Sequence, residues 1–119
     1  MDILSFREYC LAKKGVTETF PFDEQTLVFK VMDKMFALTN VDNFVSVNLK
    51  CDPEKAVTLR EEYEAVTPGY HMNKKHWNTI EMDGTISDNL IISWVDHSYD
   101  LVVSGLPKAK KLALQSLKE

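Results

Sequence analysis

Residues 44–54 read Phe-Val-Ser-Val-Asn-Leu-Lys-Cys-Asp-Pro-Glu and change from a strand pattern to a helix start within a few positions. Apolar and polar residues alternate from Val45 to Leu49, which predicts a strand with its valines and leucine toward a core and its polar residues toward water. Asp52 then offers a helix cap, and Pro53 suits the first helical position. A half-solvated strand joined directly to a helix predicts an α+β fold.

Further strands are expected on both sides of this stretch. Runs rich in valine and aromatic residues predict strands at 26–32, 35–40, 44–50 and 76–82. Asp33, Asp42 and Asp83 lie at the turns that follow the strands. The first three runs form a predicted meander within an antiparallel sheet of about five strands.

Three to four helices are expected to pack on this sheet. They are predicted at 3–14, from 53 onward, from 87 to the Gly105 and Pro107 breakers, and at 108–118. Asp2 or Ser5 can cap the first helix, and Ala56, Leu59 and Tyr63 face inward from the second. The apolar arc of the third helix carries Leu90, Ile91, Trp94, Val95, Leu101 and Val102. Leu112 and Leu117 are expected to dock the last helix.

Composition indicates one globular domain over residues 1–119. Apolar residues make up 45% of the chain and charged residues 27%, close to the averages of soluble proteins. No run approaches the roughly 18 apolar residues of a membrane span, and we expect a cytoplasmic protein. Cys10 and Cys51 are expected to stay as thiols. A net charge of -4 should repel nucleic acid, so any such binding needs a focused basic patch.

A nucleophilic site at Ser98 is not supported by the pattern. His97 is its neighbour on a predicted helix, and adjacent helical side chains point about 100° apart, so His97 cannot activate Ser98. Ser98 falls in the apolar arc, where we expect its hydroxyl to bond back to the carbonyl one turn earlier. Asp96 and Asp100 share the opposite arc, which is expected to be a solvated acidic face.

Metal and cofactor sites are not expected. His71 and His76 are five residues apart, which puts them on opposite faces of a continuous strand, and the sequence contains no CxxC pair or HExxH motif. The four glycines are far apart and each is placed at a turn or helix end, so no glycine-rich phosphate loop is predicted. We therefore expect neither a bound metal nor a nucleotide cofactor.

The segment 68–77 contains no acid and combines rings, hydrogen-bonding groups and lysines. Its candidate nucleic-acid-binding residues are Tyr70, His71, Asn73, Lys74, Lys75, His76 and Trp77. The lysines suit contacts with phosphate, His71 and Asn73 suit hydrogen bonds, and Trp77 or Tyr70 suits stacking. A structural alternative is a tight turn in which both rings pack on the sheet and the lysines only solubilise an edge.

A second basic patch is formed by Lys108, Lys110 and Lys111 in the last predicted helix. These lysines could add to a phosphate-binding surface. They could equally complement helix carbonyls.

The segment Pro68-Gly69-Tyr70-His71, followed by residues 73–77, resembles the MmcQ/YjbR-like family of small bacterial proteins. Other segments agree with the family pattern in the same order, at 29–31, 34–37, 49–53, 56–60 and 98–102. The resemblance implies a fold similar to the frataxin-like CyaY proteins, with a double-wing arrangement proposed to bind DNA. It brings no catalytic residues.

Two hairpin acids depart from what DNA-binding wings require. Asp33 occupies a turn where family members often have glycine, and Asp42 occupies the next turn. Both carboxylates would oppose DNA phosphate, which argues against these hairpins as the DNA-contacting wings.

The resulting expectation is a non-enzymatic DNA-binding domain that uses the 68–77 segment. One alternative is a protein-interaction module that docks a partner through Asp96 and Asp100 or an exposed sheet edge. Another is a small-molecule-binding protein with a pocket near His71 and Trp77.

Overall fold

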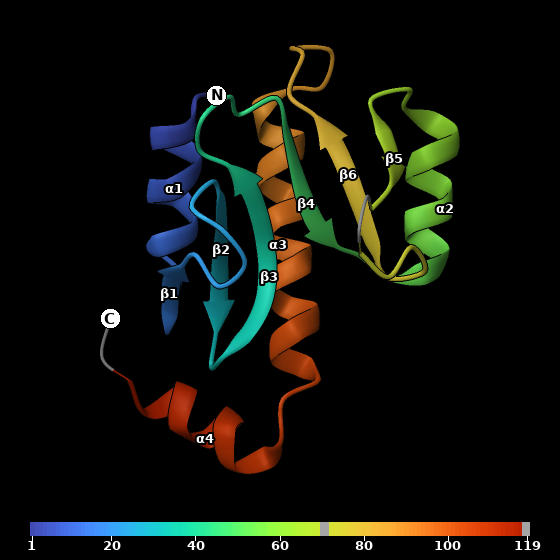
Figure 1. Cartoon of the computed structure of the whole chain (residues 1–119). Coiled ribbons are helices and arrows are strands. Elements are labelled where there is room, and N and C mark those ends of the chain that lie inside the picture. Colours follow the sequence, from blue (N-terminus) through green and yellow to red (C-terminus); the bar gives the residue numbers. More distant parts are fainter. Residues whose placement is uncertain (70–71, 118–119) are drawn as a thin grey trace.

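The computed structural model describes residues 1–69 and 72–117, and it is a sheet with helices on one side (Figure 1). The helices are α1 (Ile3–Leu11), α2 (Pro53–Glu62), α3 (Asp88–Ser104) and α4 (Lys108–Ser116). The strands are β1 (Val16–Thr19), β2 (Thr26–Val31), β3 (Lys34–Asn40), β4 (Ser46–Lys50), β5 (Val66–Pro68) and β6 (Trp77–Glu81). The α+β class predicted from the sequence is confirmed.

The sheet is antiparallel throughout, in the order β1-β2-β3-β4-β6-β5. Its six strands exceed the predicted five because both edge strands are short and weakly patterned. The β1 sequence Val-Thr-Glu-Thr has one apolar residue, and β5 ends in Pro68. Proline is tolerated at a sheet edge, where its missing N–H removes no ladder bond. Such strands become evident only from their pairing with a neighbouring strand, because their own residues have no clear strand pattern.

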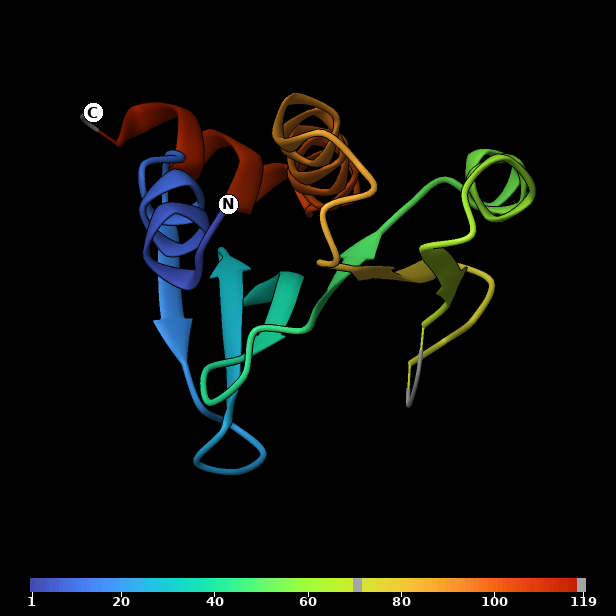
Figure 2. The same cartoon turned by 90° about the horizontal axis from the view of Figure 1, so that it is seen from above.

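All four helices cover one face of the sheet and leave the other face open (Figure 2). Strand residues on the covered face include Phe29, Val47, Leu49 and Ile80, which are each at most 2% exposed. Side chains alternate between faces, so Asn48 and Lys50 of β4 lie on the open face. Val45 is 56% exposed, and its predicted inward orientation is wrong because the strand begins only at Ser46.

Ser98 connects α3 to two strands of the sheet. Its hydroxyl donates to the Phe36 carbonyl over 2.5 Å and accepts the Lys50 backbone N–H over 2.9 Å. The expected bond to the carbonyl one turn earlier in the helix is therefore wrong. The side chain is fully buried, and the hydroxyl satisfies one group on β3 and one on β4.

Helix α4 docks through Leu114, which is 5% exposed. Leu114 approaches Gly15, where an added Cβ would lie 2.4 Å from Cδ1 of the leucine. Leu112 is 55% exposed, so the docking predicted for Leu112 is wrong. Leu117, which was also predicted to dock, is 43% exposed and approaches Gly15 with its Cδ1. The helical phase puts Leu114 toward the core and Leu112 toward solvent, because two residues correspond to about 200° of rotation.

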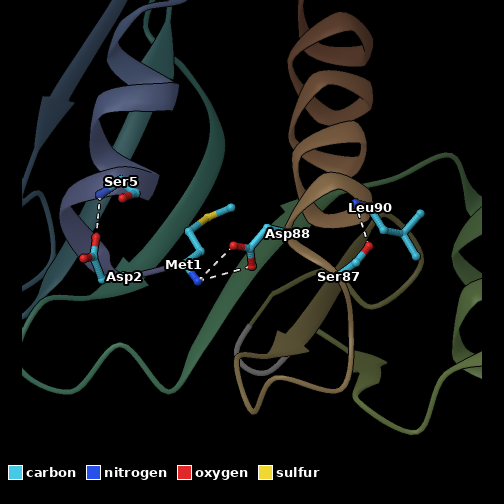
Figure 3. A network of polar contacts seen from close by, with 6 residues as sticks. All are labelled: Met1, Asp2, Ser5, Ser87, Asp88 and Leu90. Carbon is cyan, nitrogen blue, oxygen red and sulfur yellow. Dashed lines mark hydrogen bonds and ion pairs between the residues drawn. The ribbon is translucent and has the colours of Figure 1, made fainter.

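The starts of α1 and α3 lie close to each other and are both capped (Figure 3). Asp2 accepts from the Ser5 N–H over 2.8 Å, and Ser87 accepts from the Leu90 N–H over 3.2 Å. The Met1 amino group lies 3.2 Å from Oδ2 of Asp88, which joins the two helix starts. Asp2, and not Ser5, is the cap of α1. Within the described part of the chain, no helix combines the length and apolar character of a membrane span.

Candidate nucleic-acid interface

The connection from β5 to β6 is a compact turn held by its own backbone. The Trp77 and His76 N–H groups donate to the Asn73 carbonyl over 3.0 and 3.1 Å, and Gly69 N–H donates to the Trp77 carbonyl over 2.8 Å. Oδ1 of Asn73 accepts the Lys75 N–H over 3.0 Å. We call residues 72–76 the basic turn. Its folding turns both lysines outward, where they are exposed.

Arg60 of α2 anchors the basic turn to the sheet. Its Nε donates to Oδ1 of Asn78 over 2.6 Å, and its terminal nitrogen donates to the carbonyls of Lys74 and Trp77. This anchoring could not be predicted from the sequence, because Arg60 lies on α2 and its targets are mainly backbone carbonyls. The planar guanidinium suits this role because it offers several donors in a fixed geometry.

Trp77 is a core residue of the open face rather than a free ring. It is 7% exposed and forms a small apolar cluster with Val28 and Leu38, against which Met35 and Met72 pack. A ring buried to this extent offers little surface to a ligand, which argues against Trp77 as the stacking ring. The structural alternative of a ring that packs on the sheet holds for this residue.

The remaining predicted residues of the segment divide into three groups. Lys74, Lys75 and Asn73 are exposed, although the Asn73 side-chain oxygen already serves the turn. His76 is half-buried, and its carbonyl accepts the Cys51 N–H over 2.7 Å. Tyr70 and His71 lie outside the described residues, as does the part of the predicted small-molecule pocket that would depend on His71.

Lysines from separate segments meet at one end of the sheet, which we call the basic end. Lys50 ends β4 and pairs with Trp77 at the start of β6, directly after the basic turn. Lys34 begins β3, which runs antiparallel to β4, so it lies at this same end. A hollow of about 400 Å³ lies here, lined by Lys34, Met35, Lys50, Trp77, Leu101, Val102 and Gly105.

Helix α4 brings the second predicted patch near the basic end (Figure 1). Nζ of Lys110 donates to the Met32 carbonyl in the β2–β3 turn over 3.4 Å. Lys108 begins the same helix and is exposed, and Lys111 is half-buried. Lys110 therefore partly serves a backbone carbonyl, whereas Lys108 remains exposed to a ligand.

The acids are concentrated toward the opposite end of the sheet. Asp23 and Glu24 precede β2, Asp42 follows β3, and Glu81 ends β6. Asp33 is the exception among the hairpin acids, because it occupies the β2–β3 turn beside the basic end, with φ of 69°. Because neighbouring strands run in opposite directions, lysines and acids that are interspersed along the sequence come to lie mainly at opposite ends of the sheet.

The acidic face predicted on α3 carries one residue, Asp96, that contacts α1. Oδ1 of Asp96 accepts from the Tyr9 hydroxyl over 2.6 Å and lies 2.5 Å from Nζ of Lys13. Burial alone would raise the pKa of Asp96, but these two contacts from α1 outweigh it and lower the pKa. Asp96 therefore joins α1 to α3 while 43% of its side chain stays exposed, and Asp100 is exposed, so the face predicted to be solvated is in contact with water but is partly engaged by α1.

The thiols and histidines form no reactive cluster in the described ranges. Cys10 and Cys51 are free and buried, as expected, and burial raises the pKa of Cys10 to about 12. Nε2 of His97 accepts the Asp52 N–H over 3.2 Å, whereas the Ser98 hydroxyl bonds to Phe36 and Lys50 backbone groups, so the two side chains have separate partners. Among residues 1–69 and 72–117, no group of His, Cys, Asp and Glu is arranged to hold a metal ion.

The open face holds a further hollow that the sequence interpretation missed, and we call it the trough. Its volume is about 540 Å³, and it is lined by Phe22, Asp23, Thr26, Leu38, Thr39, Asn40, Ser46, Asn48, Met72 and Thr79. The loop at 20–25, which carries Phe22, projects on this side of the sheet (Figure 2). Ser46 and Asn48 alternate with buried residues in β4, so their position on the open face could be predicted from the sequence. The other lining residues come from segments that are far apart in the sequence, so the hollow itself could not be predicted.

Comparison with known proteins agrees with this fold. The model of the YjbR family matches residues 11–101. The uncharacterized protein YjbR of Escherichia coli K12 is 38% identical over 118 residues, which cover 98% of this chain and all of the relative. The uncharacterized protein YbdF of Escherichia coli O157:H7 is 40% identical over 75% of this chain and 74% of the relative.

Solved structures give the same result. The crystal structure of Deinococcus radiodurans protein DR2400, with a DUF419 domain, has a TM-score of 0.88 and 40% identity, over 95% of this chain and 87% of that one. A Pseudomonas syringae protein has a TM-score of 0.72 and 29% identity, over 85% of this chain and 98% of that one. The family match spans most of the chain, and this protein belongs to the YjbR family.

Proposed function

We propose that this protein binds DNA without catalysis, through phosphate contacts at the basic end. The observation that carries the proposal is the convergence of Lys34, Lys50, Lys74 and Lys75 from separate segments of the chain. Lysines gathered at one end of a sheet offer several phosphate contacts at once, and such contacts supply most of the sequence-independent affinity for DNA.

These lysines have their charges available. Within the described ranges, no carboxylate lies within 4.0 Å of the amino groups of Lys34, Lys50, Lys74 or Lys75. An ammonium group that is already paired would have to exchange a protein carboxylate for a phosphate. Unpaired ammonium groups release only small counterions, which favours binding at low salt.

The acidic end supports the same orientation. The net charge of -4 repels a polyanion from the molecule as a whole, but the acids lie mainly toward the end with Asp23, Asp42 and Glu81. A molecule with charges separated in this way presents its basic end to DNA as it approaches. Asp33, Asp52 and Glu54 weaken the basic end, so the proposed affinity is modest and strongly dependent on salt.

A binding role also fits the chemistry of the potential nucleophiles. Burial raises the pKa of both Cys10 and Cys51, which disfavours the reactive thiolate. The Ser98 hydroxyl is committed to two backbone groups inside the core. These observations support binding without covalent catalysis.

The test is fluorescence anisotropy with labelled DNA at several salt concentrations. Wild-type protein should bind at low salt, and the variant Lys74→Gln plus Lys75→Gln should bind more weakly, with a slope of log affinity against log salt smaller by about 2. Asn43→Asp plus Asn89→Asp is the charge-matched control, since both residues are exposed near the acidic end.

Two results would contradict the proposal. Wild-type protein that binds no DNA even at low salt would exclude it directly. Equal weakening by the lysine variant and by its control would show that affinity follows net charge alone, with no contribution from the basic end.

A further inference from the structure

The trough contains neutral hydrogen-bonding groups beside an exposed aromatic ring. Phe22 forms one wall and is 64% exposed, whereas Leu38 and Met72 supply apolar contacts near the floor. Ser46, Asn48 and Asn40 add hydroxyl and amide groups. A planar ligand with polar edges fits this combination of a ring, an apolar floor and amides better than a purely apolar ligand does.

Both amide side chains of the trough are held in a fixed orientation by their oxygens. Oδ1 of Asn48 accepts from the Thr79 hydroxyl over 2.5 Å, and Oδ1 of Asn40 accepts from the Asp42 N–H over 2.8 Å. In the described part of the chain, the amide nitrogens of Asn40 and Asn48 donate to no acceptor in the trough. Two oriented N–H₂ groups are therefore available to the carbonyl oxygens or ring nitrogens of a ligand.

The charge of the trough differs from that of the basic end. Asp23 lies on its rim and no lysine lines it. The backbone N–H groups of Thr26 and Gln25 lower the pKa of Asp23, so its carboxylate stays charged near neutral pH. A phosphate is repelled here, whereas the donor groups on the edge of a base are not.

The trough and the basic end are adjacent on the sheet. Asn48 lines the trough and Lys50 lines the hollow at the basic end, and the two lie on the same face of β4 at a separation of about 7 Å. Met72 lines the trough, and Lys74 and Lys75 follow it in the basic turn. The trough on the open face is thus a neutral site for a planar group, and it lies next to the basic end of the sheet, which is a site for an anion. A nucleotide combines these two groups.

We infer that the trough binds one unpaired base of a single-stranded nucleic acid while the basic end holds the adjacent phosphates. This inference rests on the proposed function, and it adds a preference for single strands. A base enters a pocket only when it is unpaired and unstacked, so a duplex can use the basic end but not the trough. Phe22 stacks on the base, and the amides of Asn40 and Asn48 contact its edge.

The test compares three labelled ligands of equal length, about ten nucleotides. They are an oligothymidylate, an abasic oligomer with the same phosphates, and a DNA duplex. Phe22→Ala removes the stacking ring, and Phe20→Ala is the matched control, since Phe20 is 48% exposed in the same loop but does not line the trough. Both rings are exposed, so neither change disturbs the core.

Wild-type protein should bind the oligothymidylate about tenfold more tightly than the abasic oligomer, and Phe22→Ala should remove this difference. Phe20→Ala should leave it unchanged. In ¹H–¹⁵N spectra, the side-chain amide signals of Asn40 and Asn48 should shift with oligothymidylate and not with the abasic oligomer.

Equal affinity of wild-type protein for the oligothymidylate and the abasic oligomer would overturn the inference while leaving the proposed function intact, provided that Lys74→Gln plus Lys75→Gln weakens both. Equal effects of Phe22→Ala and Phe20→Ala would also overturn it. Failure of all three ligands to bind at low salt would instead overturn the proposed function itself.

Discussion

Nε of Arg60 donates to Oδ1 of Asn78 over 2.6 Å, and this contact joins α2 to β6 behind the basic turn. Asn78 is 2% exposed and donates in turn to the Ala56 carbonyl over 3.4 Å. The same guanidinium reaches the carbonyls of Lys74 and Trp77. One side chain therefore sets the position of the turn that presents two lysines of the proposed interface.

Arg60→Lys should destabilise the protein by about 1–3 kcal/mol, because a lysine cannot serve three acceptors in this geometry and Oδ1 of Asn78 loses its donor. Urea unfolding followed by tryptophan fluorescence measures the change. Arg7→Lys is the matched control, since Arg7 pairs with Glu18 nearer the surface and should cost under about 1 kcal/mol. Equal losses in the two variants would contradict the anchoring role of Arg60.

Gly69→Ala should cost about 1–3 kcal/mol because a Cβ at this position would lie 2.8 Å from Cβ of Trp77 and 3.0 Å from its carbonyl oxygen. Thermal unfolding monitors the loss. Gly105→Ala provides the comparison, since the nearest atoms there are 3.7 Å away and φ is -89°. A Gly69→Ala protein as stable as Gly105→Ala would show that the turn accommodates a methyl group by shifting.

Ser98→Ala should cost about 2–4 kcal/mol, because it leaves the Phe36 carbonyl and the Lys50 N–H without their side-chain partner inside the core. Ser104→Ala is the control on the same helix, where the hydroxyl is exposed and donates to the Leu101 carbonyl. It should change stability by less than about 0.5 kcal/mol. Urea titration of both variants at one pH distinguishes them, and a neutral Ser98→Ala would rule out the bridging role.

The free energy of unfolding should decrease as the pH falls from about 6.5, the ordinary pKa of histidine, to the lower pKa that His97 has in the folded state. Burial lowers the pKa of His97, and the positive charge of Lys55 adds to the effect. The unfolded chain therefore binds the proton more readily, and a protonated Nε2 can no longer accept the Asp52 N–H. The free energy of unfolding should depend less on pH across this range in His97→Gln than in the wild-type protein. An unchanged profile in His97→Gln would assign the pH dependence to other groups.

Lys34→Gln and Lys50→Gln should each reduce the salt slope of DNA binding by about 1, because each lysine at the basic end contributes about one phosphate contact. Anisotropy titrations at several salt concentrations give the slope. Asn89→Asp changes the net charge by the same amount at the other end of the sheet and should leave the slope unchanged. Slopes that match wild type in both lysine variants would confine phosphate contacts to the basic turn.

Local pattern was sufficient for most of the elements. The alternation in β4, the Asp52-Pro53 helix start and the apolar arc of α3 each depend on residues that are close in sequence, and each is confirmed. The edge strands β1 and β5 were missed because they are short, and their pairing with β2 and β6 supplies what their own residues lack. Periodicity alone assigned Val45 and Leu112 to the core, and both are exposed. Val45 lies before the first residue of β4, and Leu112 lies on the side of α4 that faces solvent.

The candidate site depended far more on tertiary structure. The sequence by itself identified an acid-free lysine segment, the α+β class and the inability of His97 to activate Ser98, since these follow from composition, spacing and helical geometry. Only the folded chain decided that Trp77 is buried, that Arg60 anchors the basic turn, that Lys34 and Lys50 join it, and that the trough lies beside them. The physical reason is that antiparallel pairing brings distant strand ends together, and no local preference records which ends will meet.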